Sequence, residues 1–247
     1  PGPQSLAPNL AVRAGMRARQ SNLKVCLFDT TADLPLEKHA GMEVRSVDEL
    51  PRGPLETEDL DALIVQHVGW NLHLLRGPRT RAEEGDGEEH LALNREVLTA
   101  LRKRFDYVFV ATSILDLYSG PGRDLLAQSD QLCLEVTDNM ATVLNTAMWL
   151  GTRDMSRGPH PGEPRVGFVF CPSGDSHLTV TEARAELDGV RHLGSMPKPN
   201  DARGVDPTAL AAAGPDPVMA AALDAVLYEI TRDLAFKPRR NEWWRRY

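Results

Sequence analysis

Short apolar runs recur along the chain and give the first indication of its fold. They are rich in Val, Leu, Ile and Phe and occupy residues 23–28, 60–65, 107–111, 132–136, 166–171 and, more weakly, 190–196. Their hydrophobicity is continuous rather than alternating, as a strand covered on both faces requires. The pattern therefore predicts six strands of a mostly parallel sheet.

Segments with helical spacing of apolar residues lie between these runs. They predict helices over 9–19, 89–104, 139–150, 183–187 and 219–234. Asp138 is the expected N-cap of the third helix, and Thr179 with Glu182 has the capping-box pattern ahead of the fourth. Because strand and helix alternate, we expect a doubly wound α/β fold, with helices flanking a mostly parallel sheet.

Two polar stretches interrupt this pattern. Residues 76–89 are rich in Glu, Asp and Gly and are interpreted as a solvated loop, with a partner or metal site as the alternative. Residues 157–164 are rich in Pro and Gly and are interpreted as a surface connector. Neither stretch divides the chain convincingly, so we predict one α/β domain over residues 1–235 and a tail over 236–247.

The charge is unevenly distributed along the 247 residues. With 28 Lys and Arg against 35 Asp and Glu, the net charge is −7. The last twelve residues hold five cations and one acid, which leaves the other 235 residues at −11. The hydrophobic fraction of 42% excludes a disordered chain, and the acidic body argues against a protein covered with nucleic-acid-binding charge.

The three cysteines indicate a reducing compartment. Cys26, Cys133 and Cys171 each lie inside an apolar run, and we expect buried, reduced thiols in a cytoplasmic protein. No two are spaced as metal ligands, so no metal site is expected. No apolar stretch approaches the ~20 residues that span a bilayer, and the first residues do not have the pattern of an export signal.

The start of the chain has the order of a phosphate-binding loop. Gly2, Pro3, Gln4 and Ser5 precede a helix containing Asn-Leu-Ala, and the next strand ends at Asp29. This order resembles the ParA/MinD family of deviant Walker P-loop ATPases, whose loop reads GGxGKTT. Residues 105–113 look like the family's Walker B segment, and residues 192–197 look like its late Leu-Gly-x-Ile-Pro element. In character the chain is most similar to the CpaE/TadZ branch, which helps to position pilus machinery.

The resemblance implies a set of nucleotide-site remnants in which the key charges are missing. Pro3 stands at the position of the phosphate-binding lysine and brings neither a charge nor an N–H. Thr31 and Ala111 replace the aspartate that orients the attacking water and the Walker B aspartate. Ser5 keeps a hydroxyl for a metal, Asp29 is retained, and Asp201 matches a position that borders the base or ribose.

These losses predict a protein that does not hydrolyse nucleotide. Phosphoryl transfer depends on positioned charges, and three of them are replaced. We expect no catalytic residue, no metal and no cofactor. The alternatives are an active ATPase that binds ATP with Mg²⁺ through Lys24 or upstream residues, and an unrelated α/β protein. The family's first strand precedes the loop, so we expect that strand to be missing or to lie upstream of residue 1.

The tail mixes basic and aromatic residues, which suits a protein groove, a membrane surface or a phosphate backbone. We rank a protein partner first, then membrane, then DNA; a solvated tail is the alternative. The predicted contact residues are Lys237, Arg239, Arg240, Trp243, Trp244, Arg245 and Arg246. We expect a scaffold, positioning or assembly factor that forms a homodimer or larger assembly, in pilus or secretion machinery or in localisation at the cell pole or division site. The expected location is the cytoplasm, with the membrane surface or nucleoid as alternatives.

Overall fold

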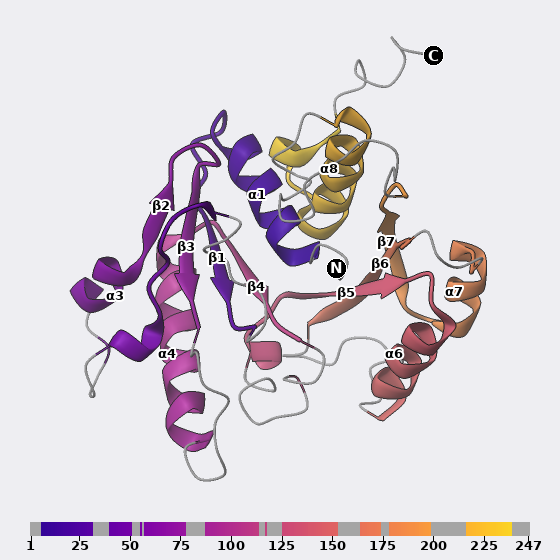
Figure 1. Cartoon of the computed structure of the whole chain (residues 1–247), viewed down its shortest axis with the longest axis horizontal. Helices are drawn as coiled ribbons and strands as arrows, with labels where there is room; N and C mark the ends of the chain where they lie inside the picture. Colours follow the sequence, from indigo (N-terminus) through magenta and orange to yellow (C-terminus); the bar gives the residue numbers. More distant parts are fainter. Residues whose placement is uncertain are drawn as a thin grey trace. The chain divides into compact units, whose positions relative to one another are not determined.

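The structure is a computed structural model of the whole chain (Figure 1). It describes residues 6–31, 40–50, 55, 57–77, 87–113, 117, 125–152, 164–173, 178–198 and 216–238. Two compact units are present. Unit 1 comprises Pro1–Leu6, Ser129–Pro207 and Gly214–Tyr247, and unit 2 comprises Ala7–Gln128 and Thr208–Ala213. The predicted extent of a single domain over residues 1–235 stays a prediction.

Unit 2 contains a four-stranded sheet of order β2-β3-β1-β4. Its strands are β1 (Val25–Asp29), β2 (Val65–His67), β3 (Leu72–Arg76) and β4 (Tyr107–Ala111). β1 runs parallel to both β3 and β4, whereas β2 pairs antiparallel with β3. The other elements of this part of the chain are α1 (Leu6–Ala18, whose first residue is assigned to unit 1), η1 (Val47–Glu49), α3 (Thr57–Leu63) and α4 (Gly87–Arg104).

A core of apolar residues joins this sheet to its helices. All five residues of β1 are buried, as predicted for a strand covered on both faces. Figure 1 shows α3 and α4 beside the strands of this sheet. One side of the sheet packs with them in a cluster that includes Cys26, Phe28, Leu60, Leu63, Leu75, Val97, Leu98 and Leu101.

One predicted strand of unit 2 is wrong. Residues 60–65 were expected to be a strand, but α3 continues to Leu63 and the strand β2 begins only at Val65. Leu60 and Leu63 are three residues apart, so on a helix they lie on one face, and both pack into the core cluster. A short apolar run fits a buried helix face as well as a buried strand, and packing decides between them.

The β2–β3 hairpin, which was not predicted, packs directly on α1. A Cβ atom placed on Gly15 would lie 2.6 Å from the carbonyl oxygen of Trp70, closer than real Cβ contacts. Asn71 donates its side-chain amide to the carbonyl of Gly15 at 3.2 Å, and Arg19 donates to the carbonyl of Val68 at 2.7 Å. Helix and hairpin backbones therefore touch with no side chain of residue 15 between them.

Unit 1 contains a parallel three-stranded sheet of order β5-β6-β7. Its strands are β5 (Gln131–Thr137), β6 (Arg165–Cys171) and β7 (Arg191–Ser195), which match three predicted strands. Its helices are α6 (Met140–Thr152), α7 (Val180–Glu186), α8 (Pro217–Thr231) and the short η5 (Leu234–Phe236). The parallel strands and flanking helices of the two units confirm the predicted α/β fold class.

The helix ends of unit 1 confirm one predicted cap and correct another. Thr179 and Glu182 form the predicted capping box at the start of α7. At α6 the cap is Asn139, whose side chain accepts from the N–H of Ala141 at 2.9 Å, and not Asp138. The predicted terminal helix over 219–234 ends earlier, at Thr231, because Arg232 adopts a left-handed conformation with φ 59°.

The remaining predictions about local structure are confirmed only in part. Residues 87–89 of the expected acidic loop belong to α4, and residues 78–86 lie outside the described residues, as do 157–163. All three cysteines are free, but only Cys26 is fully buried, whereas Cys133 and Cys171 are partly exposed.

Candidate functional site

The carboxyl ends of the strands in unit 2 bring together two residues of the predicted nucleotide site, Asp29 and Ala111. Asp29 is the last residue of β1 and pairs with Ala111, the last residue of β4. Gly77 directly follows β3. Ligands of doubly wound folds bind outside such strand ends, so this edge is the candidate site.

Asp29 is buried at this edge and is bound by its own loop. Its side chain is only 1% exposed. One carboxylate oxygen accepts the backbone N–H of Thr31 at 3.0 Å and the hydroxyl of Thr31 at 2.6 Å. Thr31, which was predicted to stand in place of a catalytic aspartate, therefore holds the neighbouring carboxylate.

Further hydrogen bonds tie the three strand ends to one another. Thr30 donates its N–H and its hydroxyl to the carbonyl of Ala111, at 2.9 and 2.8 Å. Gly77 donates its N–H to the carbonyl of Asp29 at 2.6 Å. A Cβ on residue 77 would lie 2.9 Å from the Cα of Thr30, so the close approach depends on glycine. The loops after β1 and β3 are thus fixed by backbone contacts.

At the end of β4 there is no acidic side chain. Ala111 is 1% exposed and offers only a methyl group. The next residue, Thr112, has a buried hydroxyl oxygen with no hydrogen-bond partner among the residues that the structure describes. Among the described residues, the ends of β1 and β4 therefore present hydroxyl groups and one engaged carboxylate, and Arg76 ends β3 beside Asp29.

In unit 1, too, a buried aspartate accepts hydrogen bonds from a residue that follows another strand. Asp138 directly follows β5 and is 1% exposed. One of its carboxylate oxygens accepts the backbone N–H of Ser173 at 2.8 Å, and it also accepts the Ser173 hydroxyl. Ser173 follows β6, so these two bonds join the ends of β5 and β6.

Sequence reasoning missed Glu135, an acid inside β5. Its carboxylate accepts the backbone N–H of Leu6 at 2.8 Å, a bond within unit 1. Burial raises the pKa of Glu135, and the bond from Leu6 opposes this in part. The pKa of the nearby Cys133 is raised to about 12 by burial and by the charge of Glu135. The available signal was a single acid within the apolar run 132–136.

The other predicted site residues lie mostly outside the described residues. These are Gly2, Pro3, Gln4, Ser5 and Asp201 of the nucleotide-site remnants, and Arg239, Arg240, Trp243, Trp244, Arg245 and Arg246 of the tail. Lys237 is described: its side chain is exposed, and its backbone N–H donates to the carbonyl of Leu234 at 3.2 Å. Just before it, Phe236 is completely buried and fixes the start of the tail.

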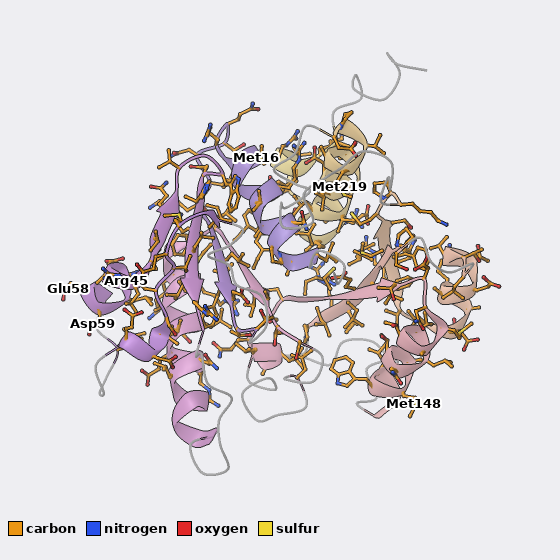
Figure 2. All side chains as sticks on the ribbon, in the orientation of Figure 1. Met16, Arg45, Glu58, Asp59, Met148 and Met219 are labelled. Carbon is orange, nitrogen blue, oxygen red and sulfur yellow. The ribbon has the colours of Figure 1, made fainter. Side chains whose placement is uncertain are left out.

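A second surface, on α6, was not predicted. Met140, Leu144 and Met148 are exposed by 42%, 44% and 69%, and they follow one another at intervals of four residues. We define these three residues as the α6 stripe; Figure 2 labels Met148 on this helix. The 13 residues of α6 include no Asp, Glu, Lys, Arg or His. Exposed apolar residues with such spacing are typical of contact surfaces.

Among the residues that the structure describes, no group of three His, Cys, Asp or Glu side chains is placed to hold a metal ion. Within the same residues no helix is both long enough and apolar enough to cross a membrane.

Sequence comparison did not identify a family, whereas structural comparison did find similar folds. No family model and no curated protein matches the chain. Among solved structures, a ParA family ATPase from Chlorobium tepidum TLS superposes with a TM-score of 0.67 and 16% identity, over 92% of each chain.

Two MinD structures are also similar to this chain. The septum site-determining protein MinD from Pyrococcus horikoshii OT3, complexed with Mg-ADP, has a TM-score of 0.59 and 18% identity, over 92% of this chain and 89% of that one. The MinC:MinD complex from Aquifex aeolicus gives 0.61 and 15%, over 91% and 88%. At these identities the comparison shows a P-loop NTPase-like fold of the ParA/MinD type.

Proposed function

We propose that this chain is a ParA/MinD-like protein that has lost nucleotide hydrolysis and acts as a scaffold or positioning factor. The observation that carries the proposal is the end of β4, where Ala111 stands beside a buried Asp29 whose carboxylate already binds Thr31. The fold is that of the ParA and MinD proteins, but Thr31 and Ala111 stand where the resemblance places two of the family's aspartates.

The described residues do not fit a magnesium nucleotide as P-loop enzymes hold it. Such enzymes place a carboxylate in the metal's shell at the strand end where Ala111 offers a methyl group. Asp29 is 1% exposed and serves as the acceptor of its own loop. In the sequence, Pro3 stands at the position of the lysine that neutralises phosphate charge. Single contacts of this kind contribute several kcal/mol to the transition state, so the replacements at Pro3, Thr31 and Ala111 together remove most of the rate.

With nucleotide hydrolysis lost, we propose that this chain acts through contacts with other proteins. The surface of unit 1 supports this proposal. The solved MinD of Aquifex aeolicus is in complex with MinC, so a protein of this fold binds a protein partner. In this chain the α6 stripe exposes three large apolar side chains. Because α6 has no formal charge, two copies of it can pack without opposing or burying charges. We therefore propose self-association through this helix, as in a homodimer.

The cellular setting follows from the resemblance to the CpaE/TadZ branch. We propose a role in pilus or secretion machinery, or in localisation at the cell pole or division site. The basic-aromatic tail after Phe236 supplies a second contact region for a protein partner. The first experiment, however, concerns the nucleotide.

Isothermal titration calorimetry of the full chain with Mg²⁺·ATP, followed by a phosphate-release assay, tests the proposal. The MinD protein solved with Mg-ADP is the positive control for binding, and the ParA family ATPase from Chlorobium tepidum TLS is the positive control for phosphate release. We expect no phosphate release above the buffer rate. Micromolar affinity together with steady phosphate release would overturn the loss of hydrolysis and favour an active ATPase. Affinity without release would leave the scaffold proposal in place and add a nucleotide as its ligand.

A further inference from the structure

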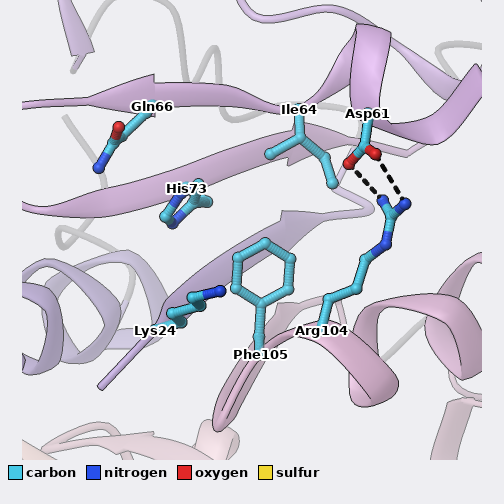
Figure 3. Close-up of a pocket in the computed structure, with 7 residues that line it drawn as sticks. All are labelled: Lys24, Asp61, Ile64, Gln66, His73, Arg104 and Phe105. Atoms are coloured by element: carbon cyan, nitrogen blue, oxygen red, sulfur yellow. Dashed lines mark hydrogen bonds and ion pairs between the residues drawn. The ribbon is translucent and has the colours of Figure 1, made fainter. Parts of the chain in front are cut away.

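Unit 2 has a pocket at the end of its sheet opposite the candidate site. Lys24 directly precedes β1, and Phe105 lies two residues before β4, so these side chains belong to the amino ends of the parallel strands. The cavity has a volume of about 390 Å³, which is within the range of small-molecule sites. Figure 3 shows its lining residues, which are Lys24, Asp61, Ile64, Gln66, His73, Arg104 and Phe105.

Strand pairing places two of the lining residues beside the core of unit 2. Gln66 pairs with His73, and His73 pairs with Cys26, so the three side chains lie in one row on one face of the sheet. Cys26 is buried in the core cluster under the helices. His73 is only half-buried and Gln66 is exposed. The pocket lies where this row extends beyond the core.

One wall of the pocket is apolar. The rings of Phe105 and His73 lie 4.9 Å apart between centroids and are tilted by 53°. Ile64, a partly buried residue that packs against the core cluster, lines the same pocket. Tilted aromatic pairs and an adjacent aliphatic chain provide a surface on which a flat ring packs favourably.

Two cations and one acid line the pocket, and the acid is paired with Arg104. The guanidinium of Arg104 binds the Asp61 carboxylate through two contacts, of 2.7 and 2.9 Å. Lys24 has no corresponding acid in the lining, and Figure 3 shows its ammonium directed toward Phe105. Its backbone is fixed, because its N–H donates to the carboxylate of Asp106 at 2.8 Å and its carbonyl accepts the N–H of Asp106 at 3.0 Å. The side chain of Lys24 thus extends from a fixed backbone.

The remaining polar groups offer hydrogen bonds to a ligand. His73 has its Nδ1 at 3.3 Å from the carbonyl oxygen of Val25. A carbonyl oxygen only accepts, so Nδ1 carries the proton. Burial and the charge of Lys24 lower the pKa of His73, although the bond to Val25 opposes them, and this favours the neutral ring at pH 7. Its Nε2 is then an acceptor, and the amide of Gln66 supplies a donor and an acceptor.

We propose that this pocket binds a small aromatic carboxylate, with its ring against Phe105 and Ile64 and its carboxylate at Lys24. A ring N–H or hydroxyl of the ligand would donate to His73 Nε2 or to the amide of Gln66. Such a site is independent of the nucleotide edge and goes beyond the proposed scaffold function, since it gives the protein a small-molecule ligand.

Nuclear magnetic resonance titration of the full chain with indole-3-acetate tests this site. We expect saturable shifts of the backbone amides around Lys24, Gln66, His73 and Phe105. Lys24→Met should weaken binding about tenfold, which corresponds to one charge-assisted contact. Indole-3-acetamide, which has the same ring without the charge, should bind wild-type protein about tenfold more weakly as well.

Lys103→Met is the matched control, because Lys103 is an exposed lysine near the end of α4 that does not line the pocket. It should leave the affinity unchanged, and Gln66→Ala, at an exposed position, should weaken it. Shifts that do not saturate at millimolar probe would overturn the proposal. Wild-type affinity in Lys24→Met would also overturn it, and the spectrum of that variant without probe shows whether it is folded.

Discussion

Thr31 donates its backbone N–H and its hydroxyl to one and the same carboxylate oxygen of Asp29, at 3.0 and 2.6 Å. The resemblance to ParA/MinD ATPases places an aspartate at position 31. An aspartate has no hydroxyl to donate at neutral pH, and it would set a second negative charge beside a buried carboxylate. With threonine at position 31, Asp29 has a structural role, because its carboxylate accepts the hydrogen bonds that fix the loop after β1.

Thr31→Val tests this structural use. The variant loses the 2.6 Å hydroxyl bond to a nearly inaccessible carboxylate and keeps the backbone bond. We expect the free energy of unfolding to fall by about 1.5–3 kcal/mol, as for a hydrogen bond to a charged group. Urea denaturation measures the change. Thr99→Val, at an exposed helix position whose hydroxyl bonds the Arg95 carbonyl and the Gln128 side chain, should cost less than about 0.5 kcal/mol because both groups are neutral and water replaces them. Equal losses in the two variants would contradict the assignment.

Gly77→Ala tests the close approach of the strand ends. The new methyl group would lie 2.9 Å from the Cα of Thr30 and 3.1 Å from the carbonyl oxygen of Asp29. Both neighbours are backbone atoms, so we expect a loss of about 1–3 kcal/mol in thermal or urea unfolding. The control is Gly151→Ala on α6, where a Cβ meets nothing within 4 Å and the variant should gain a few tenths to about 1 kcal/mol. A neutral Gly77→Ala would show that the loops are free to move apart.

Glu135→Gln should stabilise the protein at neutral pH. Burial raises the folded-state pKa of Glu135, so ionisation favours the unfolded state as pH rises through that pKa. Glutamine keeps an oxygen for the N–H of Leu6 and does not ionise. The gain should therefore be largest at pH 7–8 and disappear toward about pH 4, near the pKa of an unperturbed glutamate. Unfolding curves measured across this pH range give the difference.

Glu182→Gln is the control of opposite sign. Hydrogen bonds from the N–H and hydroxyl of Thr179 lower the pKa of Glu182, so its ionised form favours the folded state. Glutamine at this position should destabilise the protein at neutral pH, and this difference should shrink as pH falls through the folded-state pKa. The same sign in both variants would mean that a general effect of net charge dominates.

Met148→Glu should weaken self-association if α6 forms the contact between copies. A charge in the centre of an apolar contact loses its hydration, so we expect the dimer dissociation constant to rise at least about tenfold. Sedimentation equilibrium measures it. Val218→Glu makes the same kind of change at an apolar residue of α8 that is 42% exposed, and it should leave association unchanged. A chain that is monomeric at high micromolar concentration would remove the proposed dimer altogether.

Removal of residues 239–247 should change binding without changing stability. Phe236 is fully buried, so a truncation that separates the two properties has to end after it, for instance at Pro238. We expect an unchanged melting temperature for this truncation and a loss of about 3–5 kcal/mol for Phe236→Ala. A pull-down compares the partners of the full and shortened chains. If DNA is the ligand, its affinity should fall steeply with salt for the full chain alone.

The parallel strands were the best-predicted part of the fold. Burial on both faces requires a continuous apolar run, and the run at 107–111 became β4 without any shift. The run at 60–65 gave the wrong element, because Leu60 and Leu63 satisfy a helix facing the same core. The β2–β3 hairpin was missed because β2 is only three residues long and has an exposed residue between two partly buried ones, so it gives no continuous apolar run.

The residues of the candidate site could be predicted, but the hydrogen bonds between them could not. The resemblance to ParA/MinD ATPases placed Asp29, Thr31 and Ala111 in one nucleotide site, and strand pairing brings Asp29 beside Ala111. That Thr31 would bind Asp29 depends on how the loop turns after β1, which no periodicity specifies. Asp138 was expected to cap a helix, but the loop after β6 brings Ser173 to it. In both cases a bond between loop residues decided the role of the acid.

Gly15 makes α1 intolerant of change in a segment more than fifty residues away. Glycine inside a helix costs about 1 kcal/mol relative to alanine, yet here it lets the carbonyls of Trp70 and Asn71 approach the helix. Any insertion in the β2–β3 turn would move these carbonyls away and leave the space beside Gly15 unfilled. Homologous chains that keep glycine at this position should therefore keep the turn length too, so that the two segments vary together over evolutionary time.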